Sequence, residues 1–230
     1  MINILLEQYL GQSSSWLFEE LSSYIKPYHK VAVVAFSFRE NRVHSLSDWN
    51  LLYGKSQGKF YKDIIESFGL YGICEDQITF INYFSDSRKT ARHKIESSDI
   101  LYFLGGLPDR MYDRLKEFDL IETVSEHRGI AIGYSAGALI QLAEYHLSPD
   151  DDYAEFGYYK GLPFIDDFYM EVHYENTDIQ NACIERVLSE KKKMVYATYR
   201  TGAIIVDNGT IKLFGDVKVC QPSKLSYQSS

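Results

Sequence analysis

One segment limits the possible folds of this chain more than any other. An apolar run, Gly129–Gly133, leads into Gly-Tyr-Ser-Ala-Gly and then into residues that favour a helix. A strand that turns so sharply into a helix leaves the central Ser135 on a strained corner, with its hydroxyl exposed. The residues two before and two after that serine must be small, and Gly133 and Gly137 meet this requirement. The segment therefore predicts a strand–turn–helix unit that presents a serine.

The rest of the chain alternates between strand-like and helix-like segments. Apolar runs rich in β-branched and aromatic residues predict strands at Ile2–Leu6, Val31–Phe38, Ile78–Phe84, Ile100–Leu104 and Phe168–Tyr174. Helical patterns occupy Ser14–Ile25, Lys59–Phe68, Ser87–Glu96, Asp109–Phe118, Ala136–Tyr145 and Thr177–Lys191. Near-continuous apolar strands alternating with helices indicate a mostly parallel sheet covered on both faces. We therefore expect an α/β fold, a three-layer sandwich.

The end of the chain departs from this alternation. Two apolar runs, Ala203–Asp207 and Ile211–Phe214, flank Asn208-Gly209, and Asn-Gly between such runs predicts a β-hairpin. The stretch 39–58 is polar and irregular, so we expect a long surface loop there. Because no repeat or Pro/Gly-rich linker interrupts the sequence, we expect residues 1–230 to form a single domain.

Composition excludes several classes of function. The net charge of −8 argues against nucleic acid or an anionic membrane as a partner. Three widely spaced cysteines, Cys74, Cys183 and Cys220, give neither a zinc motif nor a disulfide framework, so we expect no metal and no cofactor. The first ten residues lack the features of a signal peptide, and no apolar stretch is long enough to span a bilayer. A cytoplasmic location is expected.

A serine nucleophile needs a base within hydrogen-bond reach. The chain has six histidines, namely His29, His44, His93, His127, His146 and His173. Two of them precede strands at the wrong end of the sheet, and a third lies on the solvent side of a predicted helix. His146 would lie about 16 Å from Ser135 along the same predicted helix. His44 stays open, but His173, at the end of a predicted strand, is the best candidate.

At this point the residues resemble a known family. The Gly-Tyr-Ser-Ala-Gly turn, the earlier Gly105-Gly106 turn and the strand-borne His173 are similar to the dipeptidase E (aspartyl dipeptidase) family of serine peptidases, to which cyanophycinase is related. The resemblance extends over most of the chain. It implies a fold similar to class I glutamine amidotransferases and the hydrolysis of short peptides through an acyl-enzyme.

The resemblance also implies roles for individual residues. Ser135 would be the nucleophile and His173 the general base, and the amides of Gly106 and Ala136 would form the oxyanion hole. The family takes its third triad member from the loop after the helix that follows the serine turn, where Asp150 fits the spacing best. Other carboxylates remain possible for this role: Asp151, Asp152, Glu171 and Glu175.

The sequence departs from the family in two places. The family's Gly-Gly-Gly-Asn turn is replaced by Gly105-Gly106-Leu107-Pro108. A basic residue that favours an N-terminal aspartate is replaced by acidic sequence at Asp178, so strict Asp-X specificity is not expected. Arg200 is the candidate partner for a substrate carboxylate, with Asp178 in the same binding region. We expect a small peptide substrate with a neutral or basic residue before the scissile bond, and a monomer or homodimer.

Two other functions compete with this interpretation. An α/β-hydrolase esterase also uses Gly-x-Ser-x-Gly, but its histidine usually lies near the C-terminus, and no histidine follows His173. A catalytically silent sensor or binding protein on the same fold is favoured by the altered turn at Gly105–Pro108.

Overall fold

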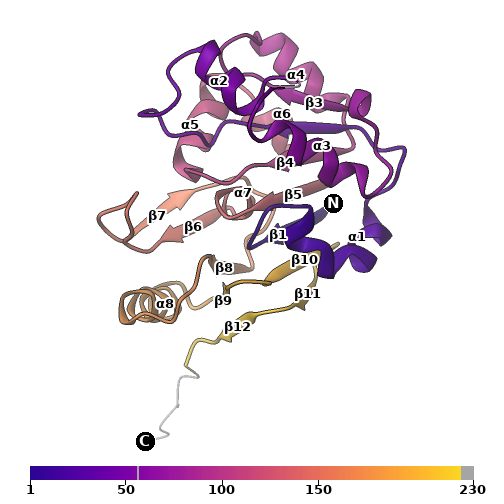
Figure 1. The fold of residues 1–230 in the computed structure, drawn as a ribbon. Coiled ribbons are helices and arrows are strands. Elements are labelled where there is room, and N and C mark those ends of the chain that lie inside the picture. Colours follow the sequence, from indigo (N-terminus) through magenta and orange to yellow (C-terminus); the bar gives the residue numbers. More distant parts are fainter. Residues whose placement is uncertain (56, 224–230) are drawn as a thin grey trace, which may run out of the picture.

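The computed structural model describes residues 1–55 and 57–223. Its main feature is a seven-stranded sheet with the order β11-β10-β1-β5-β4-β2-β3 (Figure 1). The strands are β1 (Ile2–Leu6), β2 (Val31–Val34), β3 (Ile78–Ile81), β4 (Ile100–Phe103), β5 (Ile130–Tyr134), β10 (Ala203–Asp207) and β11 (Thr210–Phe214). Five neighbouring strands run parallel, and β10 and β11 are antiparallel at one edge. The predicted α/β class with a mostly parallel sheet is confirmed.

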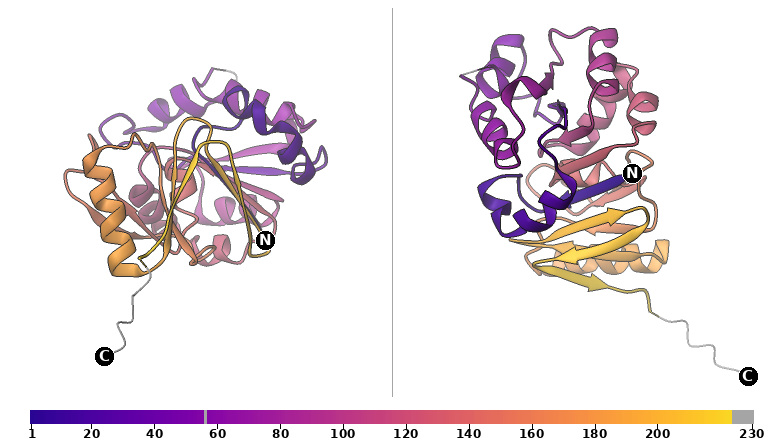
Figure 2. Two further views of the ribbon diagram at one scale, coloured as in Figure 1. Left: turned by 90° about the horizontal axis from the view of Figure 1, so that it is seen from below. Right: turned by 90° about the vertical axis from the view of Figure 1, so that its right-hand side faces the viewer.

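Helices cover both faces of this sheet, because alternate strand residues point to opposite sides. Figure 2 (right) shows the two helical layers with the sheet between them. On one side lie η1 (Gln12–Leu17), α1 (Phe18–Tyr24), α2 (Leu46–Tyr53) and α3 (Tyr61–Gly69), and on the other α4 (Arg88–Glu96), α5 (Pro108–Glu117) and α6 (Ile121–Ser125). Val31 and Val33 join the first core, and Ala32 and Val34 join the second. This is the expected three-layer arrangement.

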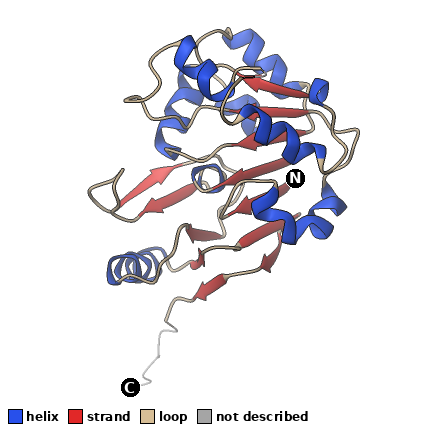
Figure 3. Cartoon of the chain, in the orientation of Figure 1, coloured by secondary structure: helices blue, strands red, loops and turns tan. Residues whose placement is uncertain are grey.

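The second half of the chain adds smaller elements beside the main sheet (Figure 3). A three-stranded sheet contains β8 (Phe168–Glu171), β9 (Met194–Thr198) and β12 (Val217–Cys220), and α8 (Asp178–Lys191) packs against β8 and β9. A separate antiparallel pair is formed by β6 (Glu144–Leu147) and β7 (Gly157–Lys160). These elements share a third core with β1 and β10, which brings residues near 173 beside the centre of the main sheet.

The C-terminal hairpin forms where the sequence predicts it. β10 and β11 pair in register from Ala203–Phe214 to Asp207–Thr210. Asn208 and Gly209 both have positive φ, at 47° and 83°, as a two-residue hairpin turn requires. The hairpin extends the main sheet because β10 pairs with β1.

The stretch 39–58 is not the expected surface loop, because it contains α2. The Ser45 side chain accepts a hydrogen bond from the Asp48 amide and so caps the start of this helix. Trp49 and Tyr53, one helical turn apart, are buried in the core. The polar sequence around it gave no sign of this short helix, which these two aromatic residues anchor in the core.

The helix after the turn at Ser135 is also shorter than predicted. This helix, α7, comprises only Ala136–Leu139. His146 therefore lies on β6 and not on the helix that follows Ser135. The backbone of the next residues bonds to a distant segment: Leu162 donates to the carbonyl of Ile140, and Gly161 to that of Ala143. Tertiary hydrogen bonds therefore override the local preference for a helix.

No helix in the described part of the chain is both long enough and apolar enough to cross a membrane.

Candidate active site

The turn at the end of β5 holds Ser135 in a strained conformation. Its φ is 51°, a value that side-chain-bearing residues rarely adopt. A Cβ atom on Gly133 would lie 1.9 Å from the carbonyl oxygen of Gly137, and one on Gly137 would lie 2.0 Å from that of Phe103. Only glycine fits at both positions. The Ser135 amide donates to the carbonyl of Leu6 at 3.0 Å, which fixes the turn against β1.

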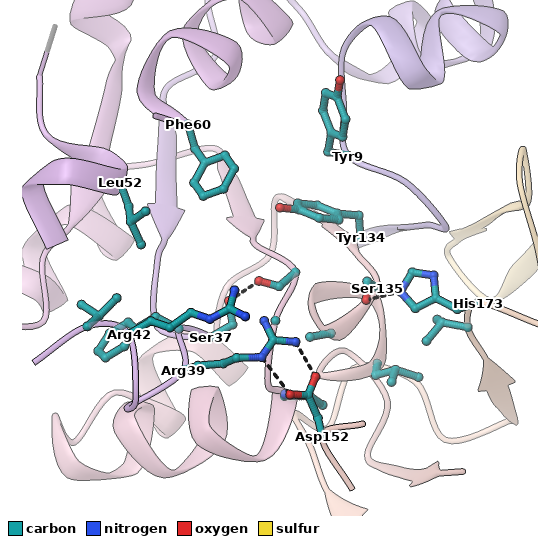
Figure 4. A pocket seen from close by; sticks show the side chains of 18 of the residues that line it. Tyr9, Ser37, Arg39, Arg42, Leu52, Phe60, Tyr134, Ser135, Asp152 and His173 are labelled. Carbon is teal, nitrogen blue, oxygen red and sulfur yellow. Dashed lines mark hydrogen bonds and ion pairs between the residues drawn. The ribbon is translucent and has the colours of Figure 1, made fainter. Parts of the chain in front are cut away.

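His173 lies within hydrogen-bond reach of this serine. The distance from Ser135 Oγ to His173 Nε2 is 2.7 Å (Figure 4). His173 follows the end of β8, and its imidazole is 60% exposed. The structure therefore brings together the two residues that the sequence singles out, in the geometry that allows proton transfer between them.

The carboxylate on the other side of the imidazole belongs to Glu7. His173 Nδ1 donates to Glu7 Oε1 at 2.6 Å, and the His173 backbone amide donates to the same carboxylate at 3.1 Å. Because the carboxylate accepts the Nδ1 proton, Nε2 is left free to accept the proton of Ser135. Glu7 directly follows β1, the strand next to β5 in the sheet.

Glu7 is buried and held from a second side. Its side chain is only 5% exposed, and Thr198 Oγ1 donates to Glu7 Oε2 at 2.7 Å. Thr198 is the last residue of β9 and is fully buried. The carboxylate thus accepts hydrogen bonds from both His173 and Thr198, which offsets the cost of burying its charge.

The pKa of His173 is raised above its ordinary value. The largest cause is the hydrogen bond to Glu7, which favours the charged imidazolium, and partial burial opposes it. The negative charges of Glu7, Asp150 and Glu171 add smaller effects in the same direction as the hydrogen bond. The site therefore makes the imidazole a stronger base than a free histidine.

The expected third member, Asp150, does not reach His173. Its Oδ1 accepts the backbone amides of Asp152 and Tyr153, both at 2.8 Å, so it caps its own loop. Glu7 occupies the position beside the imidazole instead. The sequence offers one weak signal for Glu7, an acidic residue directly after the first predicted strand, at the end of the sheet where ligands bind, but this signal does not assign it to His173.

The other candidate carboxylates have separate partners. Glu171 is buried and bonds to His146 Nε2 at 2.7 Å and to Ser148 Oγ at 2.9 Å. Asp152 pairs with Arg39. The remaining two, Asp151 and Glu175, are exposed to solvent, and neither forms a hydrogen bond or an ion pair with His173 in the described part of the chain.

The predicted oxyanion-hole residues lie beside Ser135. Gly106 and Ala136 line the same cleft as the serine, and within the described residues neither backbone amide donates to a protein acceptor. Gly106 has a φ of 136°, and a Cβ atom there would lie 2.3 Å from the carbonyl oxygen of Ser37. The next amide, that of Leu107, donates to this same oxygen at 2.8 Å. The altered turn therefore keeps a free amide at Gly106.

Arg114 holds the segment against which this turn packs. From α5, its Nη1 donates to the carbonyls of Phe36 and Phe38 at 2.5 and 2.8 Å. Its guanidinium lies over the Phe38 ring at 3.6 Å, and burial lowers its pKa. The buried arginine thus fixes the chain after β2, including Ser37.

Ser135 and His173 open onto a cleft of about 680 Å³. Arg39, Arg42 and Lys59 are its basic residues, all from or next to the stretch that was expected to be a surface loop. The acidic residues that line it are Glu7, Asp48, Asp150 and Asp152. Positive and negative side chains are therefore nearly balanced.

The two predicted substrate-binding residues lie outside this cleft. Arg200, with a φ of 50°, lines a separate groove on the other side of His173, together with Tyr199 and Lys218. Asp178 begins α8, where its charge suits the helix N-terminus, and its side chain is exposed. The structure does not bring either residue to the cleft that Ser135 lines.

No group of three or more His, Cys, Asp or Glu side chains arranged to hold a metal ion occurs among the residues that the structure describes.

The chain is similar to solved structures and to one family model. Solved structures with the same fold include a protein from Listeria monocytogenes EGD-e described as a peptidase E, at 18% identity and a TM-score of 0.60, covering 96% of this chain and 98% of that one. A peptidase from an acI-B1 actinobacterium is similar at 19% identity and a TM-score of 0.61, covering 98% of this chain and 91% of that one. No curated protein matches the chain.

The model of Peptidase family S51 matches residues 56–214. With its serine turn and its fold, the chain belongs to peptidase family S51, the dipeptidase E family of serine peptidases.

Proposed function

We propose that this serine peptidase cleaves short peptides through a Ser135–His173–Glu7 triad and an acyl-enzyme. The observation that carries the proposal is the continuous hydrogen-bond chain from Ser135 Oγ through both ring nitrogens of His173 to Glu7. Each member has the partner that its role needs: the serine a base, and the base a carboxylate that fixes its tautomer.

The steps follow from this arrangement. Ser135 Oγ attacks the scissile carbonyl carbon while its proton passes to His173 Nε2. The oxyanion that forms accepts hydrogen bonds from the amides of Gly106 and Ala136. The carbon–nitrogen bond then breaks as His173 returns the proton to the leaving amine, and an ester to Ser135 remains. Water, deprotonated by His173, attacks this ester and releases the acid and the free serine.

Strict specificity for Asp-X dipeptides is not expected. The cleft contains more acidic than basic side chains, four against three, and Arg39 is already neutralised by Asp152. Such a cleft gives no strong positive field that would require an aspartate before the scissile bond. The sequence argument against aspartate is also weaker, because Asp178, on which it rests, does not line the cleft. Neutral and basic residues at that position are proposed to be accepted.

The two competing functions lose their support. The silent binding protein was favoured by the altered turn, but Gly106 keeps an amide that is free to bind an oxyanion. The α/β-hydrolase esterase does not agree with membership of family S51.

The decisive experiment compares wild type with Ser135→Ala. We expect the wild type to react with a fluorophosphonate probe and to hydrolyse members of a dipeptide and acyl-ester library, and the variant to do neither while keeping its fold. Unchanged turnover in Ser135→Ala would overturn the proposal.

A further inference from the structure

One wall of the cleft is made of exposed apolar side chains. Leu51 on α2 is 68% exposed, and Phe60 is 37% exposed, yet both line the cleft. In Figure 4 the upper part of the cleft is surrounded by four side chains, those of Leu52, Phe60, Tyr9 and Tyr134. None of them takes part in the hydrogen bonds at Ser135. Large apolar side chains that line a concave surface and remain open to solvent are typical of a ligand site.

Two arginines face this wall across the cleft, and they differ in their partners (Figure 4). Arg39 is bound by Asp152 in a two-pronged contact, with Nε at 2.8 Å from Oδ1 and Nη2 paired to Oδ2. Arg42 has no carboxylate within 4.0 Å in the described part of the chain, and its side chain is exposed. Arg42 is therefore the guanidinium of this cleft that is available to a ligand.

We infer that Arg42 binds a carboxylate of the substrate while the wall of Leu51, Leu52 and Phe60 packs against a neighbouring apolar side chain. The inference rests on the proposed function, because it names the substrates that the same cleft selects. A guanidinium fork matches a carboxylate in shape and charge. The preferred substrates are short peptides that carry a large apolar side chain and a free carboxylate.

The other cations fit this role less well. Lys59 lies over the Phe60 ring at 5.1 Å, and its ammonium is a strongly hydrated point charge. Arg200 lines the separate groove on the far side of His173. Arg42 and α2 also precede residues 56–214, the part that the family model matches. Arg42, Leu51 and Leu52 therefore lie outside that match, and Phe60 lies inside it.

Binding can be measured without turnover. In the Ser135→Ala background, calorimetry would compare three ligands: Ala-Phe, its C-terminal amide, and Asp-Phe amide. We expect Ala-Phe, Asp-Phe amide or both to bind about tenfold more tightly than Ala-Phe amide, as one charged hydrogen-bonded contact implies. The comparison also identifies the source of the carboxylate, either the peptide C-terminus or an acidic side chain.

Variants then assign the contact to one arginine. Arg42→Gln should remove the difference between the acid and the amide, and Arg42→Lys should restore part of it. Arg128→Gln is the matched control, because Arg128 bonds to backbone carbonyls before the start of β5 and should leave the difference intact. The inference is overturned if Arg42→Gln keeps the difference, if Arg200→Gln abolishes it instead, or if no ligand with a carboxylate binds better than Ala-Phe amide.

The apolar wall has its own test. Leu51→Ser changes a side chain that is mostly exposed, so the fold should be unaffected. It should weaken the binding of Ala-Phe several-fold and leave that of Ala-Gly unchanged, because only the larger side chain reaches the wall. Equal effects on both peptides would overturn this part of the inference.

Kinetics separate this inference from the proposed function. Arg42→Gln should raise KM for peptides with a carboxylate and change kcat little, because a contact to a group that does not react is equally strong in the ground state and the transition state. If Ser135→Ala still hydrolyses peptides, the proposed function fails. If only the KM pattern of Arg42→Gln is absent, the subsite fails and the triad stands.

Discussion

Glu7 receives two hydrogen bonds from the same residue, one from the ring of His173 and one from its backbone amide. The positive φ of His173, 53°, accompanies this double contact, in which the amide and the imidazole meet one carboxylate. The ring can therefore rotate away from Ser135 only by breaking the contact with Glu7. Because the Glu7 carboxylate binds both the backbone amide and the ring of His173, it sets the position of the imidazole as well as its tautomer.

Glu7→Gln is expected to lower kcat by about 10³- to 10⁴-fold. The amide has one acceptor oxygen where the carboxylate has two, and an NH2 group that faces Nδ1 would favour the other tautomer of the imidazole. Asp150→Asn is the matched comparison, and it should have a much smaller effect because Asp150 caps its own loop. Initial rates on one peptide substrate measure both. A larger loss in Asp150→Asn than in Glu7→Gln would return the role to Asp150.

The pH dependence of kcat/KM should show a rise centred above 6.5, the ordinary pKa of histidine. His173 must be neutral to accept a proton, and Glu7 raises its pKa, so activity is lost as the pH falls through that raised value. Glu7 also stabilises the folded protein by its contact with the charged imidazolium. This contribution to stability depends on pH in the opposite direction to activity. It is fully present below 6.5 and is lost as the pH rises through the raised pKa. A pH series of kcat/KM and of urea unfolding would test the rise in activity and the loss of stability. In Glu7→Gln the residual activity should rise at a lower pH than in wild type, because the pKa of His173 is no longer raised by the carboxylate.

Gly106→Ala should lower kcat by about 10²- to 10³-fold, as loss of one oxyanion donor does. The new Cβ would lie 2.3 Å from the Ser37 carbonyl oxygen, so the turn must move and its amide with it. Gly209→Ala is the control for backbone strain alone, since Gly209 also has positive φ but nothing lies within 4 Å of the added atom. Steady-state kinetics on both variants would test this, and equal kcat values would contradict the assigned donor.

His146→Leu should lower the free energy of unfolding by about 3 kcal/mol or more. The change leaves the Glu171 carboxyl group buried with Ser148 as its remaining side-chain partner. Replacing both residues, as in His146→Leu with Glu171→Met, should recover much of the loss. Urea unfolding provides the measurement. A loss below about 1 kcal/mol in the single variant would mean that the pair contributes little.

Much of the fold could be predicted because local patterns agree with the final structure. Ile2–Leu6 and Ala203–Asp207 form strands with the predicted bounds, and the Asn208-Gly209 turn forms as expected. The helix after Ser135 was overestimated because its residues favour a helix but bond to a distant segment. Such long-range hydrogen bonds leave no local signal.

Only part of the candidate site could be predicted from the sequence. Ser135 lies in a motif with strict local requirements, and His173 ends a predicted strand, so both could be found. Glu7 could not be assigned, because its role depends on β1 lying beside β5, a pairing between distant segments. Arg42 was missed because the stretch around it was expected to be a loop, although Ser45 and Asp48 form a helix-capping pattern.

The place of β1 between β5 and β10 has a consequence for how the protein folds. Glu7 precedes His173 by 166 residues and Thr198 by 191, so its contacts with them require segments that are made much later. A growing chain therefore carries its acidic group long before it carries a site. Contacts of such sequence separation slow folding, and these three residues can come together only after Thr198 has been made.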